Sequence, residues 1–315
     1  MKKILFYLSV LFFISSCSNN EIGIKYQLTT VVDGTDLVAN LINPYDKANF
    51  FPDGKVSTNF NVRTTYLIYD NGGSLIDQKT LFSESFFTKN TFSNNLDAGT
   101  YTVISIMDII YNNADFDWTI KDLTKLSTAN ITTVGKVPSQ YGILGYHKEL
   151  ITITNQGKKL SMIPQHIGAL YVIHIDNVDY SKIRYVYYKF TISPDTYQIS
   201  TNNASTINTY YYDNKWDNQG IYTGYYDYAY LLPNFNLNIN YERYDTNNKS
   251  IDNGLYTISQ SIVAGNHQVL NIDISQNMYN NSALSRIKSN INILNIARDK
   301  SISINKLGYS TCKTK

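Results

Sequence analysis

The feature that most constrains the fold is a period-two alternation of side-chain character from residue 25 to about residue 275. Successive side chains of a β-strand point to opposite faces, so this alternation predicts strands, whereas a helix needs a period of 3.6. Gly, Asn and Asp clusters punctuate the pattern, as in the hairpin turn expected at residues 70–73. Strands separated by turns, with no helical pattern between them, predict an all-β protein built as sandwiches.

The strands are predicted at residues 25–32, 56–69, 74–80, 100–107, 151–154, 160–163, 169–175, 184–192, 206–212, 226–232, 237–244, 255–262 and 267–274. The strand at 100–107 is apolar on both faces, so we expect it near the centre of a sheet.

The chain is predicted to form two lobes. Residues 108–147 carry few apolar anchors, and we expect a crossing segment there, with one helical turn. A short echo between residues 97–104 and 263–270, each with Ala-Gly before a strand, favours two similar sandwiches in tandem. We place them at residues 25–147 and 148–275. Residues 276–315 form a basic tail, in which Leu284, Ile287, Ile291 and Leu294 fall at helical spacing and Ile302 and Ile304 alternate like a strand.

The N-terminus carries an export signal. Two lysines precede a short apolar run that ends on Ile14-Ser15-Ser16-Cys17, and this run is too short for a spanning helix, which needs about 20 apolar residues. The tetrapeptide resembles the lipobox of bacterial lipoproteins. That resemblance implies cleavage after residue 16, lipid attachment at Cys17 and a tether over residues 17–24. The alternative is an ordinary signal peptide with an incidental Cys17.

Charge and cysteine content narrow the function further. Loss of Lys2 and Lys3 with the signal leaves 25 basic residues against 25 acidic ones, which argues against nucleic-acid binding. The tail is an exception, because it contains a single acidic residue, Asp299, and seven basic ones: Arg286, Lys288, Arg298, Lys300, Lys306, Lys313 and Lys315. With Cys17 lipidated, Cys312 has no partner for a disulfide. The fold must therefore depend on its hydrophobic core.

Patterns for catalysis, metals and cofactors are weak. No Gly-x-Ser-x-Gly elbow or phosphate-binding loop occurs, so we expect no enzyme and no cofactor. The histidines are scattered without metal-binding pairs, and we predict no metal site; they are His147, His166, His174 and His267. Asp115 and Asp117 beside Trp118 are the one carboxylate pair that a glycosidase could use; the alternative is a solvated loop.

The second lobe is notably rich in aromatic residues, with nine from Tyr210 to Tyr230. Exposed rings on a sandwich face stack on sugars, so glycan binding is an alternative function. The candidate stacking residues are Trp118, Trp216, Tyr222 and Tyr225. Against this, tyrosine is abundant throughout the chain and is an ordinary strand residue that packs in cores.

Three phrases carry a family resemblance: Thr64 to Asp70, Leu96 to Val103 with its Ala-Gly-Thr-Tyr, and Gly168 to Ile175. Together with the lipobox, they resemble the fimbrillin superfamily of Bacteroidota, and most of all its minor, lipid-retaining anchor subunits. One position departs from the family pattern, since His166 stands where many relatives have an arginine before the second-lobe strand.

The resemblance implies two tandem transthyretin-like, Greek-key β-sandwich domains in a lipoprotein of the outer membrane, exposed at the cell surface. It implies a part in building or anchoring fimbriae, with other fimbrial subunits as partners, and it leaves anchor, stalk and tip roles open. Ile302 and Ile304 are candidate contacts of a donor strand that fills a neighbour's groove. The alternative for this tail segment is an extra edge strand or a loose end. Glycan binding is the second function considered and a glycoside-active enzyme the third.

Replacing Cys17 with serine is predicted to release the protein from the membrane fraction. Each buried acyl CH₂ contributes about 0.8 kcal/mol, and two or more chains make a durable anchor. Fractionation after a salt wash checks this. A variant that still pellets with membranes would contradict lipidation or reveal a second membrane contact.

Overall fold

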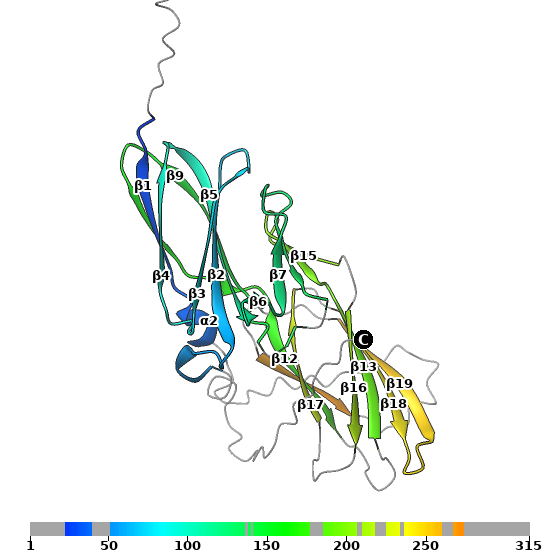
Figure 1. Cartoon of the computed structure of the whole chain (residues 1–315). Helices are drawn as coiled ribbons and strands as arrows, with labels where there is room; N and C mark the ends of the chain where they lie inside the picture. The colour runs from blue at the N-terminus through cyan, green and yellow to red at the C-terminus, as the bar shows by residue number, and fades with distance from the viewer. Residues whose placement is uncertain are drawn as a thin grey trace, which may run out of the picture.

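The computed structural model describes residues 23–39, 51–135, 138–139, 141–176, 185–206, 210–217, 225–233, 236–259 and 267–273. Regular structure in these ranges is nearly all β, which confirms the predicted fold class (Figure 1). The helical pieces among them are α2 (Thr35–Ala39) and the 3₁₀ turn η1 (Pro52–Gly54). No helix in this part of the chain is long and apolar enough to cross a membrane.

The first sandwich contains β1 (Tyr26–Val32), β2 (Phe60–Tyr69), β3 (Leu75–Ser83), β4 (Asn90–Leu96), β5 (Gly99–Tyr111), β9 (Gly145–Ile153) and β10 (Lys158–Met162). One sheet has the order β10-β1-β4 and the other the order β9-β5-β2-β3, with the short strands β11 (Gln165–His166) beside β9 and β6 (Ala114–Asp115) beside β5. As expected for an apolar strand, β5 lies inside its sheet. Side chains from both sheets, among them Leu28, Tyr66, Val103, Ile151 and Leu160, form the core between them.

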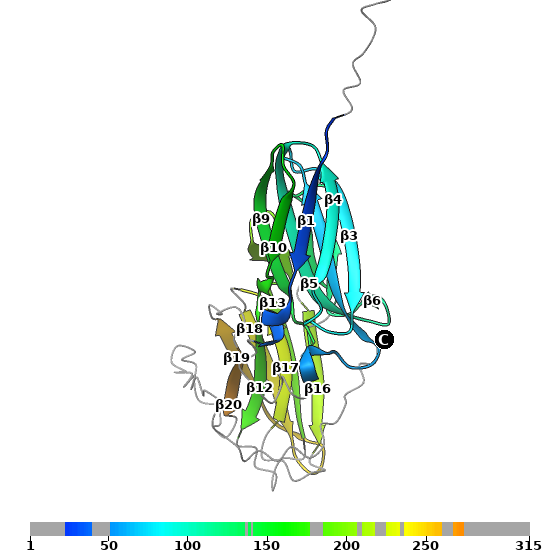
Figure 2. The same ribbon diagram turned by 90° about the vertical axis from the view of Figure 1, so that its left-hand side faces the viewer.

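The second sandwich repeats this arrangement. Its strands are β12 (Ala169–Asp176), β13 (Tyr185–Ser193), β16 (Tyr210–Asp217), β17 (Tyr225–Leu231), β18 (Asn236–Tyr244), β19 (Ser250–Ser259) and β20 (His267–Asp273). They form sheets of order β17-β12-β20 and β16-β13-β18-β19. In each three-stranded sheet the strand that comes first in the chain lies in the middle, and the strand that comes last is its parallel neighbour (Figure 2). The expected tandem of two similar sandwiches is thus present in the topology.

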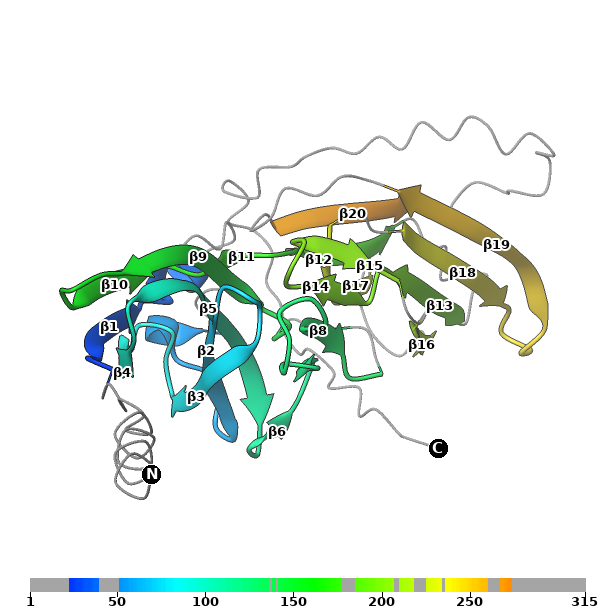
Figure 3. The same ribbon diagram turned by 90° about the horizontal axis from the view of Figure 1, so that it is seen from above.

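A third, small sheet joins the two sandwiches. It consists of β7 (Trp118–Lys121), β8 (Asn130–Thr133), β14 (Thr196–Gln198) and β15 (Asn203–Ser205), in the order β15-β14-β8-β7. The hairpin β7–β8 comes from a connection in the first sandwich and β14–β15 from one in the second, and they meet through three β8–β14 pairs (Figure 3). The helical turn expected within residues 108–147 is therefore wrong: β6 pairs with β5, β7 and β8 form a hairpin, and β14 from the second sandwich extends that hairpin into a sheet.

The strand pairing also places the boundary between the two sandwiches later in the chain than we predicted. We expected residues 148–275 to form the second one, but β9 pairs with β5 and β10 pairs with β1. The side chains of Ile153 and Met162 are buried in the first core. The first sandwich therefore needs β9 and β10 to complete its sheets, and the second begins with β12.

The echo between residues 97–104 and 263–270 has no counterpart in the topology. It precedes β5 in one lobe and β20 in the other, and these strands hold different positions in their sandwiches. A short Ala-Gly motif marks the start of a strand, whereas long-range pairing decides the position of that strand in a sheet.

Candidate functional site

The N-terminal strand β1 is the described element that directly follows the predicted tether, and it is built into the first core. Leu28, Thr30 and Val32 alternate as buried side chains along it. The Thr30 and Tyr66 hydroxyls lie 2.9 Å apart, and the ring of Tyr66 stacks on Phe92 at 4.6 Å. Burial raises the pKa of Tyr66 to about 12, so this hydroxyl stays protonated.

Both edges of β1 are paired. It forms seven antiparallel pairs with β4 and five parallel pairs with β10. Without β1, the backbone groups of β4 and β10 that face it would have no partner, and the buried positions beneath it would be open. Such a groove is what an extended strand fills in β-augmentation. In this chain β1 itself occupies that position.

The end of β1 is fixed by the turn into α2. The Asp33 backbone N–H donates to the Met162 carbonyl (3.0 Å), which ties the turn to β10. The Asp33 carboxylate accepts from the Thr35 N–H (3.1 Å) and hydroxyl (2.6 Å) and pairs with Lys89 (2.9 Å). Burial opposes ionisation here, but the hydrogen bonds from Thr35 and Lys89 lower the pKa of the Asp33 carboxyl.

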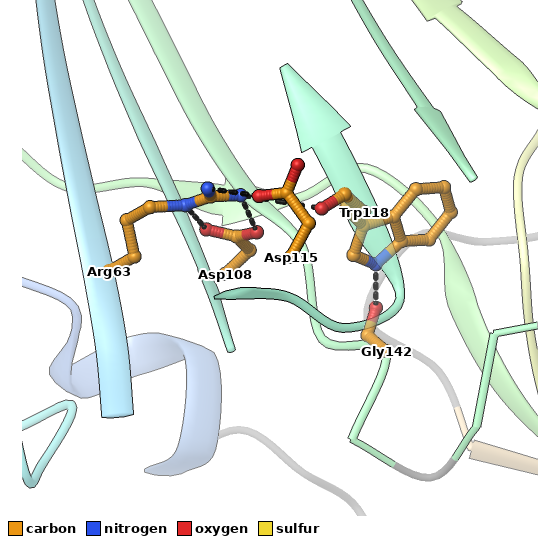
Figure 4. Close-up of polar contacts among 5 residues, drawn as sticks. All are labelled: Arg63, Asp108, Asp115, Trp118 and Gly142. Carbon is orange, nitrogen blue, oxygen red and sulfur yellow. Dashed lines mark hydrogen bonds and ion pairs between the residues drawn. The ribbon is translucent and has the colours of Figure 1, made fainter. Parts of the chain in front are cut away.

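An ion pair network secures the insertion that leads to the third sheet (Figure 4). The Arg63 guanidinium on β2 donates to both oxygens of the fully buried Asp108 on β5, at 2.8 and 2.6 Å. It also donates to Asp115 at 2.5 Å and to the Trp118 carbonyl at 3.4 Å. This planar, bidentate geometry is the strong form of an Arg–carboxylate contact. The network thus holds β6 and the start of β7 against the large sheet.

The carboxylate pair considered for glycosidase chemistry has structural contacts. Asp115 pairs with Arg63, and the fully buried Asp117 accepts from the Ser139 N–H (3.0 Å) and hydroxyl (2.7 Å). The alternative of a solvated loop is therefore wrong for Asp117. Among the described residues, no group of three His, Cys, Asp or Glu side chains has the arrangement of a metal site.

Trp118 is not an exposed stacking residue. Its side chain is 0% exposed, its indole N–H donates to the Gly142 carbonyl (2.7 Å), and its ring meets Tyr230 edge-on at 6.0 Å. The prediction that Trp118 stacks on a glycan is wrong, because its side chain points from β7 into the interior, where it is part of a second hydrophobic core. That core lies between the large sheet of the first sandwich and the third sheet.

Three other candidates for glycan stacking lie partly or wholly outside the described structure. Trp216 lies in β16 and Tyr225 in β17, but their side chains are not described, and Tyr222 is outside the described residues. The predicted lipid site Cys17 and the tail residues Ile302 and Ile304 also lie outside them.

Tyr230 and His166 form the polar centre of the junction between the sandwiches. The Tyr230 hydroxyl on β17 accepts from the Gly168 N–H (2.9 Å) and lies 3.3 Å from both the Leu144 carbonyl and His166 Nδ1. His166 Nε2–H donates to the Leu37 carbonyl in α2 (2.7 Å). One histidine thus joins α2 of the first sandwich to a strand of the second.

Close packing and burial define this junction further. A Cβ at residue 168 would collide with the Leu231 carbonyl and the Tyr230 ring, so the position needs glycine. Burial lowers the pKa of His166, although the hydrogen bond to Leu37 opposes this, and neutral histidine is therefore favoured. The sequence singled out His166 only through the family resemblance, as a position where many of the proteins it resembles have arginine. It gave no sign of the contact with Leu37, which is 129 residues away in the chain.

Comparisons with known proteins returned structural similarity alone. No protein-family model matches the sequence, and no curated protein matches it. A Bacteroides ovatus protein provisionally described as an adhesin is 13% identical, with a TM-score of 0.43 over 76% of this chain and 80% of that one. A Bacteroides thetaiotaomicron protein provisionally described as polysaccharide-binding is 10% identical (TM-score 0.47; 73% and 79% covered). The fimbrial anchor protein Mfa2 of Porphyromonas gingivalis is 11% identical (TM-score 0.45; 73% and 82% covered).

Replacing Asp108 with asparagine should lower the free energy of unfolding by about 3 kcal/mol, because it leaves the partly buried Arg63 charge without its bidentate partner. Urea denaturation measures this. Lys89→Met is the matched control, since it removes an ion pair with Asp33 from an exposed position, where such pairs contribute little. Equal losses in the two variants would contradict the role assigned to the Arg63 network.

His166 should make stability depend on pH. Its pKa is lowered in the folded state, so below about pH 6.5, the ordinary value, the unfolded state binds more protons and stability falls as the pH falls. His166→Gln removes this term. The difference in unfolding free energy between wild type and variant should therefore shrink from pH 7 to pH 5. A pH-independent difference in denaturation curves would exclude His166 as the source.

Proposed function

We propose that this protein is a fimbrillin-like lipoprotein of the outer-membrane surface that anchors fimbriae or forms part of them, and that it acts by assembly and adhesion rather than catalysis. The observation that carries the proposal is the position of β1. The strand that follows the predicted lipid tether is the middle strand of its sheet, paired on both sides. A pull on the tether is therefore transmitted directly to the folded body.

The same position favours an anchor role within the proposal. A subunit that accepts a neighbour's strand between β4 and β10 must first lose the strand that lies there. In this chain Leu28, Thr30 and Val32 fill that place and are fully buried. The intact chain would therefore donate a strand rather than receive one, and its tail, with Ile302 and Ile304 in alternation, is the candidate donor.

Removal of residues 298–315 tests the assembly role. Donor-strand use predicts a normally folded and normally lipidated protein that no longer co-purifies with fimbrial subunits. A sharper pair of variants is Ile302→Ser with Ile304→Ser, against Ser301→Ala with Ser303→Ala as the control on the other face of the same segment.

Only the isoleucine variant should lose the subunits, because alternate side chains of an added strand fill the pockets of its groove. Retained co-purification of the deletion variant would contradict the donor role. Loss of its cooperative unfolding transition would show instead that the tail belongs to its own core. Binding of the wild-type protein to a glycan array would favour the alternative function.

A further inference from the structure

The first and last strands of each three-stranded sheet, in chain order, are parallel neighbours. In the first sandwich β1 and β10 are paired over five positions, from Leu28 with Lys158 to Val32 with Met162. In the second, β12 and β20 are paired over seven, from Leu170 with His267 to Asp176 with Asp273. The arrangement is the same although the two pairs of strands share no sequence motif.

Parallel pairing fixes how tension acts on each pair. The chain enters the β1–β10 pair at the start of β1 and leaves it at the end of β10, and these points lie at opposite ends of the pair (Figure 2). A pull on the two ends of the chain therefore drives β1 and β10 past each other along their length. Because the hydrogen bonds run across the strands, all of them resist at once. A pull that separates the strands at one end would break them in turn.

The second sandwich is loaded in the same way. The chain enters it at the start of β12 and leaves the described structure at the end of β20, again at opposite ends of a parallel pair. The two pairs therefore lie in series along the covalent chain. Each first strand is also held on its other side, β1 by β4 and β12 by β17, with seven antiparallel pairs in each case.

Side chains strengthen the first pair where their positions are described. The buried Leu28, Thr30 and Val32 of β1 lie beside the buried Leu160 and Met162 of β10. Sliding one strand by a single residue would turn these side chains from the core to solvent. At the exit end, His147 Nδ1 lies 3.0 Å from the Ile163 carbonyl, so the chain leaving β10 is fastened to β9.

Tension between the sandwiches has two paths. The covalent path runs from β10 through β11, which pairs with β9, and on to β12. The second path is the third sheet, in which β8 from the first sandwich pairs with β14 from the second. The junction around Tyr230 is therefore supported from both sides.

We infer that the two sandwiches are shear clamps in series, and that the protein is built to carry tension from its N-terminal to its C-terminal end. The source of that tension rests on the proposed function, in which the lipid holds one end and a fimbrial partner the other. The mechanical property is a consequence of the strand order and needs neither lipid nor partner for its test.

Single-molecule pulling in two geometries tests the inference. The mature chain from residue 18, with Cys312→Ser, carries one handle at its N-terminus and a second handle either at its C-terminus or on a cysteine introduced by Gln156→Cys. Residue 156 is exposed and lies in the turn before β10, at the same end as the start of β1. The first geometry shears the β1–β10 pair, and the second peels it open.

The first sandwich should rupture at a several-fold higher force when sheared than when peeled, because sheared hydrogen bonds break together and peeled ones break in turn. The two pulling speeds must be equal, because the force of unfolding depends on the rate of crossing the unfolding barrier. In the end-to-end geometry the gain in extension identifies each event. The unfolded contour lengths are about 480 Å for residues 26–162 and about 370 Å for residues 169–273, at about 3.5 Å per residue, and each gain is that length minus the folded length. Equal forces in the two geometries would overturn the inference.

Two proline variants distinguish a loss of mechanical resistance in the β1–β10 pair from a general loss of thermodynamic stability. Thr29→Pro removes a backbone donor from β1, whereas Thr80→Pro removes one from β3, an edge strand outside the load path. Both should lower the melting temperature, but only Thr29→Pro should lower the end-to-end rupture force of the first sandwich. A similar fall in force with Thr80→Pro would contradict the clamp. Loss of fimbrial co-purification alone would leave the clamp intact and bear on the assembly role.

Discussion

The pairing of β1 on both of its edges is the constraint on which the first sandwich depends. Twelve register positions, seven with β4 and five with β10, hold a seven-residue strand whose alternate side chains lie in the core. Without it, β4 and β10 would share no sheet, and the core side chains Leu28 and Val32 would be missing from between the layers. The same plan in the second sandwich, with β12 in the middle, suggests that the strand order itself matters to what the protein does.

The junction between the sandwiches is held by groups that come from far apart in the chain. Arg63 and Asp108 fasten the insertion that carries Trp118, and the Trp118 ring meets Tyr230 of the second sandwich. His166 then connects Tyr230 to α2. Because these contacts share partners, substitutions at two of them should have non-additive effects on the free energy of unfolding. The two sandwiches are therefore expected to unfold as coupled units rather than independently.

Two predictions from the sequence failed for the same physical reason. An aromatic residue beside two aspartates looked exposed, but Trp118 is buried because β7 pairs with β8 and packs its inner face on the large sheet. Residues 148–162 looked like the start of the second lobe, but they complete the first. For residues 148–162 the local pattern indicated strands, whereas at β7 it indicated a crossing segment with a helical turn. In both cases the surface that the segment packs against lies far along the chain, where no local signal reports it.

The sequence by itself determined the all-β class, most of the strands and the central position of β5, because periodicity and turn residues are local properties of the chain. Tertiary structure alone decided which sheet each strand joins, the third sheet made from two distant hairpins, the burial of Asp117 and Trp118, and the contact of His166 with Leu37. It also decided that the first and last strands of each three-stranded sheet run parallel. A period of two states that side chains alternate between two faces; only long-range pairing decides what covers each face and in which direction the neighbouring strand runs.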